Sequence, residues 1–199
     1  MNKIILSGLV VLLSSTVHAN QHLVQAKQNF EQHCVRDLPQ PILNAKSLQQ
    51  HQFKLLPAAD RISTAVGGSN DLIMAHEQGR LADQSLLQVK QDGCEFINTE
   101  VTLQLAASKI EQQGKLCQSC LINTLKQYQR YFKQDQQEVY LLGIERLEHG
   151  LKGKKLQVKY DYSLDADSEI SSTTRVEALV KNPKNQTWTI TLLMSVGPL

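Results

Sequence analysis

The sequence predicts an α+β fold in which two helices pack on antiparallel β-sheet. Three observations predict this class. Apolar residues recur with helical spacing after Gly114, several later segments alternate apolar and polar residues, and Gly, Pro and Asn clusters separate these segments. The first pattern is typical of amphipathic helices, the second of half-buried strands and the third of turns. Residues 115–196 show the patterns most clearly, and they predict one helix followed by a four-stranded antiparallel meander.

The helix of this C-terminal stretch is predicted from the spacing of its large apolar side chains. Offsets of four, three and four place four residues on one helical face: Leu121, Leu125, Tyr128 and Phe132. Polar residues lie between them and suit a solvated face. The pair Cys117 and Cys120 falls in the first turn of this helix.

Four strands are predicted after the helix. Three of them alternate strictly, as strands with one buried and one solvated face do, and the first alternates more loosely. Their ranges are Val139–Leu147, Lys155–Tyr162, Thr173–Lys181 and Thr187–Met194.

The N-terminal half repeats this order less clearly. A helix is predicted over Gln21–Leu38, where Pro39 and Pro41 stop it, and Pro57 is expected to end the first strand. The strand candidates are His51–Leu56, Leu72–His76, Leu86–Lys90 and Glu95–Leu105. Two α-β4 units side by side are one interpretation, and a single larger sheet that contacts both helices is the other.

Residues 1–19 predict a signal peptide. Lys3 supplies the charged start, Ile4 to Leu13 supplies the apolar core, and Val17 and Ala19 suit cleavage after Ala19. The apolar run is shorter than the roughly 20 residues that span a bilayer. We therefore expect a periplasmic or secreted protein with no membrane span after cleavage. Its two parts, 20–110 and 111–199, either fold separately or form one domain.

The charge balance argues against nucleic-acid binding. The chain has 21 Lys and Arg against 19 Asp and Glu, a net charge of +2. Removal of Lys3 with the signal peptide lowers this to about +1, whereas nucleic-acid-binding proteins usually carry a basic face. No motif indicates a cofactor.

Four cysteines follow the signal peptide: Cys34, Cys94, Cys117 and Cys120. An even number in an exported chain predicts disulfide bonds. Three pairings are possible, and the sequence does not select among them. Only one pair is closely spaced, whereas zinc ribbons usually contain two such pairs, so no metal site is expected.

The motif Cys117-Gln-Ser-Cys120 has two interpretations. At a helix N-terminus a cysteine thiolate is stabilised, which is how exchange-active cysteines arise. The usual setting of such a motif is a βαβ unit, but here an antiparallel meander is predicted to follow. Because of that mismatch we favour structural disulfides, with Cys117 and Cys120 as the catalytic pair only if the protein is redox-active.

Other candidate chemistry is weaker. The segment Gly150–Lys155 resembles a phosphate-binding loop but lacks the required spacing and hydroxyl residue, so it is predicted to be a solvated hairpin loop. Asp165–Glu169 is predicted to be an exposed acidic loop. No HExxH or GxSxG motif occurs, so no catalytic residue is assigned and we favour a protein that is not an enzyme.

These observations lead to three functional hypotheses. The first is an exported, disulfide-stapled binding protein whose partner is another protein, of the inhibitor, immunity or envelope assembly factor type. The alternative is a periplasmic thiol–disulfide oxidoreductase that uses Cys117 and Cys120. The third is a carrier of a small apolar ligand, with aromatic side chains lining its cavity: Tyr140, Tyr160, Tyr162 and Trp188.

Overall fold

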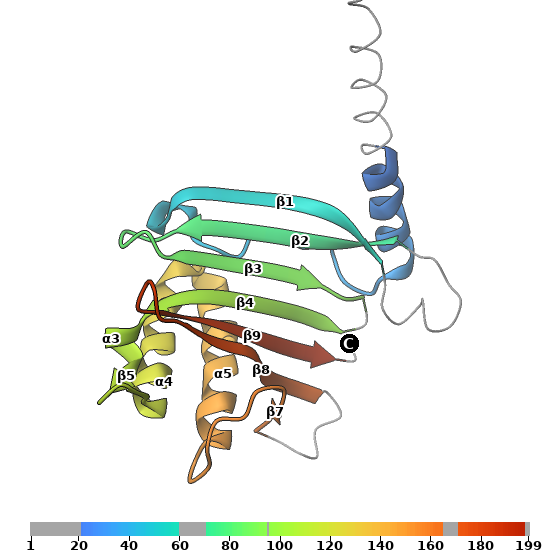
Figure 1. Cartoon of the computed structure of the whole chain (residues 1–199). Helices are drawn as coiled ribbons and strands as arrows, with labels where there is room; N and C mark the ends of the chain where they lie inside the picture. Colours follow the sequence, from blue (N-terminus) through green and yellow to red (C-terminus); the bar gives the residue numbers. More distant parts are fainter. Residues whose placement is uncertain (1–20, 60–70, 95, 165–170, 198–199) are drawn as a thin grey trace, which may run out of the picture.

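The structure is a computed structural model, and it describes residues 21–59, 71–94, 96–164 and 171–197. The predicted signal peptide and the acidic segment Asp165–Glu169 lie outside these residues. Within the described ranges, seven strands form one antiparallel sheet and two short strands form a separate ribbon. Helices lie on one side of the large sheet (Figure 1). The protein is therefore mixed α and β, with strands predominating.

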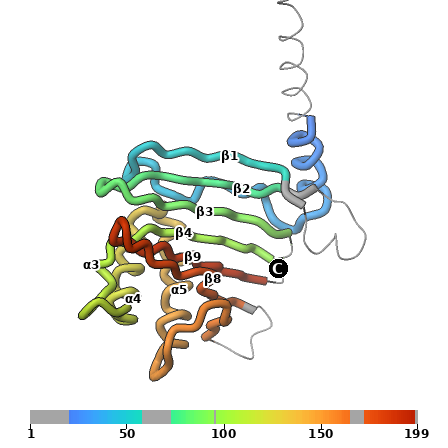
Figure 2. Tube along the Cα trace, viewed as in Figure 1, coloured from blue at the N-terminus to red at the C-terminus, as the bar shows by residue number. Residues whose placement is uncertain are grey.

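The large sheet joins strands from both halves of the chain. Its order is β1-β2-β3-β4-β9-β8-β7, so the last long strand pairs with β4 after the chain has passed through the helices. Figure 2 shows the two halves meeting along β4 and β9. The strands are β1 (Gln49–Ala59), β2 (Asp71–Arg80), β3 (Leu86–Asp92), β4 (Ile97–Ala106), β7 (Asp161–Tyr162), β8 (Ser171–Asn182) and β9 (Thr187–Gly197).

The remaining elements precede the sheet or lie between β4 and β7. A helix covers residues 21–33. The others are η1 (Ala45–Ser47), α3 (Ala107–Ile110), the ribbon strands β5 (Glu111–Gln112) and β6 (Lys115–Leu116), α4 (Gln118–Gln127), η2 (Tyr128–Tyr131) and α5 (Gln134–Gly150).

The main core lies between the sheet and helices α4 and α5. Fully buried side chains meet there from both layers: Val101, Leu103, Leu121, Leu125, Ile144, Leu147, Ile190 and Leu192. On the sheet side, Val101 lies opposite Leu192 and Leu103 opposite Ile190 in the β4–β9 register. Each such side chain stabilises the fold by about 1.5–3 kcal/mol when it leaves water, so this layer supplies most of the apolar burial.

A smaller cluster fastens the N-terminal helix to the sheet. Ala26 and Phe30 of residues 21–33 are buried against Ile73 of β2, with Leu55 of β1 beside them. The helical offset of four between Ala26 and Phe30 agrees with the predicted apolar face. The helix ends at residue 33, ahead of the prolines that were expected to stop it.

The predicted strand Val139–Leu147 is wrong, because this segment belongs to helix α5. Its buried residues are separated by four, three and four positions: Tyr140, Ile144, Leu147 and Leu151. That spacing is helical, and it repeats the spacing of the helix that was recognised. The C-terminal half therefore contributes two packed helices and three sheet strands, rather than one helix and a four-stranded meander. Two α-β4 units are not found in the described chain.

The predicted strand Lys155–Tyr162 is also mostly wrong, since only Asp161–Tyr162 forms a strand. Lys159 has a φ of 60°, which breaks an extended run. Val158 and Tyr160 are 46% and 47% exposed, so the alternating apolar side chains do not share a buried face.

Pro57 does not end β1, which runs to Ala59. Among the described strands, β1 lies at the edge of the sheet and pairs only with β2. A proline is tolerated on an edge strand because its missing N–H removes no ladder bond there. The other strand predictions are confirmed as β2, β3, β4, β8 and β9, with boundaries shifted by a few residues.

Candidate functional site

The candidate site begins with the short ribbon that precedes the Cys-x-x-Cys motif. Gln113 and Gly114 form its turn with φ values of 51° and 74°. Two left-handed residues in succession are typical of the tight turn that joins antiparallel strands. The chain then returns toward α3, where the Cys117 N–H donates a 2.8 Å hydrogen bond to the Ile110 carbonyl. These contacts fix the position of Cys117 at the start of α4.

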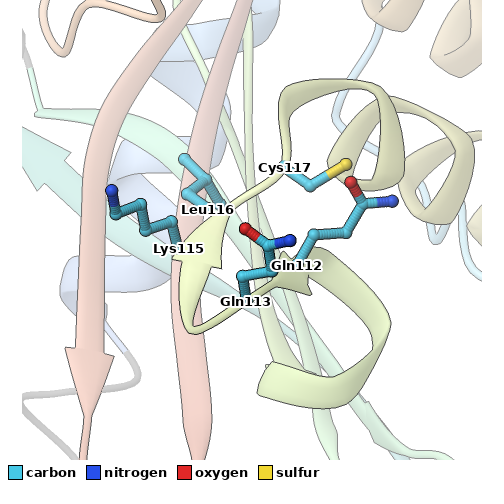
Figure 3. Close-up of a pocket in the computed structure, with 5 residues that line it drawn as sticks. All are labelled: Gln112, Gln113, Lys115, Leu116 and Cys117. Atoms are coloured by element: carbon cyan, nitrogen blue, oxygen red, sulfur yellow. The ribbon is translucent and has the colours of Figure 1, made fainter.

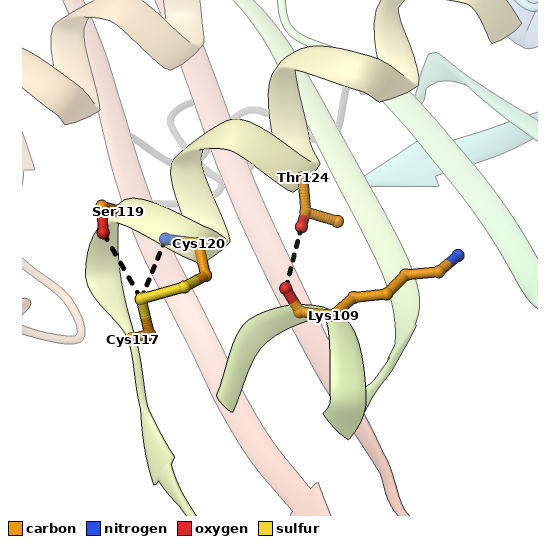
Figure 4. The surroundings of a disulfide bond; sticks show 5 residues. All are labelled: Lys109, Cys117, Ser119, Cys120 and Thr124. Carbon is orange, nitrogen blue, oxygen red and sulfur yellow. Dashed lines mark hydrogen bonds between the residues drawn. A yellow bond between two sulfur atoms is a disulfide. The ribbon is translucent and has the colours of Figure 1, made fainter. Parts of the chain in front are cut away.

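Cys117 and Cys120 form a disulfide with each other. Cys117 is the N-cap of α4, and its Sγ accepts a hydrogen bond from the Cys120 N–H at 3.2 Å. The Ser119 hydroxyl lies 3.3 Å from the same sulfur (Figure 4). The first sulfur thus takes the place of the side-chain oxygen that usually satisfies free N–H groups at a helix start.

Cys117 is partly exposed and lines an open pocket of about 560 Å³. The other lining residues come from the ribbon: Gln112, Gln113, Lys115 and Leu116. Figure 3 shows Gln112 on the same side of the ribbon as Cys117, while Lys115 extends from the other side. A partner can therefore approach the first sulfur of the pair from solvent.

A lysine-rich segment packs against the residue after Cys117. We call residues 151–160 the basic loop. The Gln118 side chain donates to the Lys154 carbonyl at 3.0 Å and accepts from the Leu156 N–H at 3.1 Å. Lys154 and Lys155 are exposed. Positive charge and a helix N-terminus both favour a thiolate over a thiol, and the two Gln118 hydrogen bonds place the backbone of this lysine-rich segment beside the residue that follows Cys117.

The second disulfide, Cys34–Cys94, has different surroundings. It joins the end of the N-terminal helix to the turn between β3 and β4, and both cysteines pack against the smaller apolar cluster. The Arg36 Nε donates to the Gly93 carbonyl at 3.0 Å, and burial lowers the pKa of the Arg36 guanidinium. This bridge lies at the far end of the sheet from α4 (Figure 1). Cys34 and Cys94 are therefore too far from Cys117 and Cys120 to form disulfides with them in the folded protein.

The ribbon is fastened to the large sheet by a small polar cluster. The Trp188 Nε1 of β9 donates to the Glu111 carboxylate at 2.7 Å, and the Lys181 ammonium of β8 lies 2.6 Å from the same oxygen. The Lys181 ammonium also lies 5.8 Å from the centre of the Trp188 ring. Hydrogen bonds from Lys181 and then Trp188 hold the pKa of Glu111 below its ordinary value.

A second polar cluster is buried under the N-terminal strands. The Glu77 side chain is 1% exposed, and its oxygens accept from the N–H groups of Ile42 and Leu43 at 2.7 and 3.1 Å. The His51 Nε2 lies 2.6 Å from the same carboxylate. These hydrogen bonds hold the segment before η1 against the sheet, so we assign the Glu77 cluster a structural role.

A row of polar side chains crosses the sheet face opposite the helices. Gln78 donates to Gln52 at 2.9 Å, Gln88 donates to Gln78 at 3.4 Å, and the Thr102 and Thr191 hydroxyls lie 3.1 Å apart. These residues occupy one row that crosses five strands, because each lies opposite the next in the strand registers. The row gives the protein a broad, hydrogen-bonding surface.

The aromatic residues proposed to line a ligand cavity do not share one. Tyr140 and Tyr162 are buried in the core, whereas Tyr160 is 47% exposed. Trp188 is partly buried at the ribbon contact. The space between sheet and helices is occupied by the apolar side chains of the main core.

The described part of the chain contains neither a metal-binding group of side chains nor a helix that could span a membrane. No group of three or more His, Cys, Asp or Glu residues is placed to hold a metal ion in that part. None of the helices formed by those residues is long and apolar enough to cross a membrane.

The sequence identified the two cysteines of the site but missed the residues around them. Gln118 carries no sequence signal for its contact with the basic loop, because the contact depends on where α5 ends. Glu111 and Trp188 lie 77 positions apart in the chain. A correct prediction of α5 would have placed the lysines of residues 152–155 near the start of α4.

The chain was compared with protein-family models, with curated proteins and with solved structures, and none of the three comparisons gave a match.

Proposed function

We propose that this protein exchanges disulfides with cysteine-bearing proteins in an oxidising compartment outside the cytoplasm. The observation that carries the proposal is the self-contained Cys117–Cys120 bridge at the N-cap of α4. Cys34 and Cys94 are bonded to each other, so the motif is not used to join distant segments. The predicted signal peptide and the two disulfides support the compartment.

The exchange reaction conserves electrons and protons. A substrate thiolate attacks the Cys117 Sγ, which forms a mixed disulfide and releases the Cys120 sulfur as a thiolate that takes up a proton. A second substrate thiolate then attacks the substrate sulfur of the mixed disulfide and releases the Cys117 thiolate. Two substrate thiols have been oxidised to a disulfide, and the Cys117–Cys120 bridge has been reduced to two thiols. The reverse sequence reduces a substrate disulfide.

The surroundings of Cys117 favour it as the sulfur that leaves last. Its Sγ accepts the Cys120 N–H, and a hydrogen bond to a thiolate is stronger than one to a neutral sulfur. The helix N-terminus and the basic loop add positive potential. A leaving thiol of lowered pKa departs faster, so each of these features accelerates release of the substrate.

The experiment that tests the proposal is thiol trapping of the oxidised protein along a glutathione redox series, with the trapped cysteines located by peptide mass spectrometry. We expect Cys117 and Cys120 to open together at roughly −120 to −270 mV, the range of oxidoreductases. Cys34–Cys94 should stay closed until below about −300 mV, as structural disulfides do. Resistance of Cys117–Cys120 to the same limit would overturn the proposal.

A Cys117→Ser variant separates exchange from folding. It should lose exchange with a reduced test protein while its far-UV circular dichroism stays unchanged. Ser119→Ala is the matched control, because it removes a neighbour of the sulfur and leaves both cysteines in place.

A second candidate function is the non-enzymatic binding of another protein. The polar row across the open face of the sheet favours it, since this surface is regular and is not covered by the helices. A photo-crosslinker at Thr102 should then capture a defined partner that the same crosslinker at exposed Lys133 does not. Carriage of an apolar ligand is the least supported hypothesis, because core side chains occupy the space between the layers.

A further inference from the structure

We infer that the substrate segment recognised at Cys117 is acidic and docks on the basic loop. The inference rests on the proposed function, because it names the partner chemistry of the same site. It comes from the position of the loop beside the disulfide, which neither the motif nor the fold class indicates.

The charge of the loop has one sign. Between Glu148 and Asp161 the sequence contains no acidic residue and four lysines: Lys152, Lys154, Lys155 and Lys159. All four are exposed. Among the described residues, none of the four forms an ion pair with a carboxylate, whereas Lys126 and Arg175 do. A surface of unpaired like charges attracts an oppositely charged partner and speeds its arrival.

The loop is held in place beside the disulfide. Leu151 is 7% exposed and Leu156 packs against the main core, so the segment that carries Lys152, Lys154 and Lys155 is anchored at both ends. The Gln118 side chain bonds the backbone on either side of Lys155. In Figure 1 the start of α4 and the end of α5 lie at the same end of the helix pair. The lysines are therefore fixed near the reactive sulfur rather than on an unrelated surface.

A protein segment fits this surface better than a membrane does. The loop also exposes Val158 and Tyr160, and basic residues with apolar neighbours occur at membrane surfaces. An exchange-active disulfide beside the loop acts on a partner that carries thiols or a disulfide, and a lipid headgroup carries neither. The open pocket at Cys117 has side-chain amides at Gln112 and Gln113, which suit the backbone of an extended peptide.

The test measures reduction of Cys117–Cys120 by three cysteine peptides of equal length with negative, zero and positive net charge. We expect the acidic peptide to react roughly tenfold faster than the neutral one at low salt. Added salt should bring this ratio toward one, because exposed charges are screened. Free glutathione serves as a fourth arm, which distinguishes an acidic peptide segment from a small anionic thiol.

Two charge-reversal variants decide where the preference arises. Lys154→Glu with Lys155→Glu should bring the acidic-to-neutral ratio to one or below. The control, Lys46→Glu with Lys133→Glu, makes the same change in net charge at exposed positions outside the basic loop and should leave the ratio unchanged. Because a ratio is compared, a general effect of the lysines on the thiol pKa cancels.

Each failure has its own signature. Exchange at equal rates with all three peptides overturns the acidic-partner inference and leaves the proposed function standing. Preference for glutathione over the acidic peptide, or binding to anionic vesicles with no preference among peptides, also overturns it. Absence of exchange with every peptide overturns the proposed function. The acidic peptide with Ser in place of Cys then tests the surface alone, and failure to bind the native protein more tightly than the Lys154→Glu, Lys155→Glu variant overturns the inference too.

Discussion

The Trp188 indole donates a 2.7 Å hydrogen bond to the Glu111 carboxylate, and this bond joins β9 to the ribbon that leads into Cys117. Lys181 of the neighbouring strand contacts the same oxygen. The β5–β6 ribbon is only two residues long on each side, so it relies on such contacts for its position. The pocket beside the disulfide therefore depends on Lys181 and Trp188, two residues that follow helices α4 and α5 in the chain.

Replacing Glu111 with Gln should loosen this contact. The amide keeps the shape of the side chain but loses its charge, and hydrogen bonds to a charged acceptor are about twice as strong as neutral ones. Trp188 is the only tryptophan of the chain, so its fluorescence reports on this position. We expect easier quenching by acrylamide in Glu111→Gln than in the native protein. Glu138→Gln, at an exposed position of α5, should leave quenching unchanged.

The same cluster should respond to acid. The pKa of Glu111 is held below its ordinary value by the hydrogen bonds from Lys181 and Trp188. A lowered pKa means that the contact contributes fully above the ordinary carboxylate value and is lost as the pH falls through the lowered one. Acrylamide quenching of Trp188 should stay level from neutral pH to the ordinary carboxylate range and then rise. A level curve throughout is expected for Glu111→Gln, and a level curve in the native protein would contradict the assignment.

The parts of the fold that were predicted from sequence are those in which one local pattern decides the structure. The strict alternation of β9 and the turn at Gly93 needed no tertiary information. The strand predicted over 139–147 is wrong because that prediction depends on an apolar run, although Tyr140, Ile144 and Leu147 have helical spacing. Its neighbour, residues 155–162, alternates but has no partner strand for most of its length.

The candidate site shows a different limit. Cys117 and Cys120 were visible because they are close in sequence, and their pairing with each other was one of three possibilities. The contacts that set their environment come from segments distant in sequence, through Gln118 to the basic loop and through Glu111 to Trp188. Such contacts follow from the packing of whole elements, and an error in one helix removes them from a prediction.

The two disulfides should differ in their contribution to stability. Cys34 and Cys94 are 60 positions apart, whereas Cys117 and Cys120 are 3 apart. The entropy lost by the unfolded chain grows with the closed loop, so we expect a loss of about 4 kcal/mol for the Cys34→Ser, Cys94→Ser double variant and about 2 kcal/mol for the Cys117→Ser, Cys120→Ser one. Urea unfolding of both variants measures this. Equal losses of stability, or a larger loss for the Cys117→Ser, Cys120→Ser variant, would contradict a structural role for Cys34–Cys94 and an exchange role for Cys117–Cys120.

Glu77 should be the most sensitive buried polar residue. Its carboxylate accepts two backbone N–H groups and contacts His51. Glu77→Leu leaves these donors without an acceptor, and we expect a loss of about 3 kcal/mol. Glu100→Gln breaks a more exposed pair with Lys90 and should cost less than about 1 kcal/mol. Thermal or urea unfolding of the two variants gives the comparison. Similar losses would show that the buried Glu77 cluster stabilises the fold no more than the exposed ion pair does.

Gly150→Ala tests how the end of α5 holds the basic loop. A methyl group there would lie 2.3 Å from the Tyr162 ring. The ring is 3% exposed, and its hydroxyl accepts from the Gln157 N–H at 2.9 Å, so it cannot move aside without losing that bond. Alanine improves helix propensity by at most about 1 kcal/mol, while overpacking costs about 1–3 kcal/mol.

The expected net effect of Gly150→Ala is a loss of about 1–2 kcal/mol in unfolding free energy, because overpacking against a rigid ring outweighs the gain in propensity. In a Tyr162→Ala background the ring is absent, and the same change should then be neutral or stabilising. Urea unfolding of the four proteins in this cycle measures the coupling between the two positions. Equal effects of Gly150→Ala in both backgrounds would mean that the Tyr162 ring does not pack against the end of α5. In that case Gln118, Leu151 and Leu156 would position the basic loop without help from Tyr162.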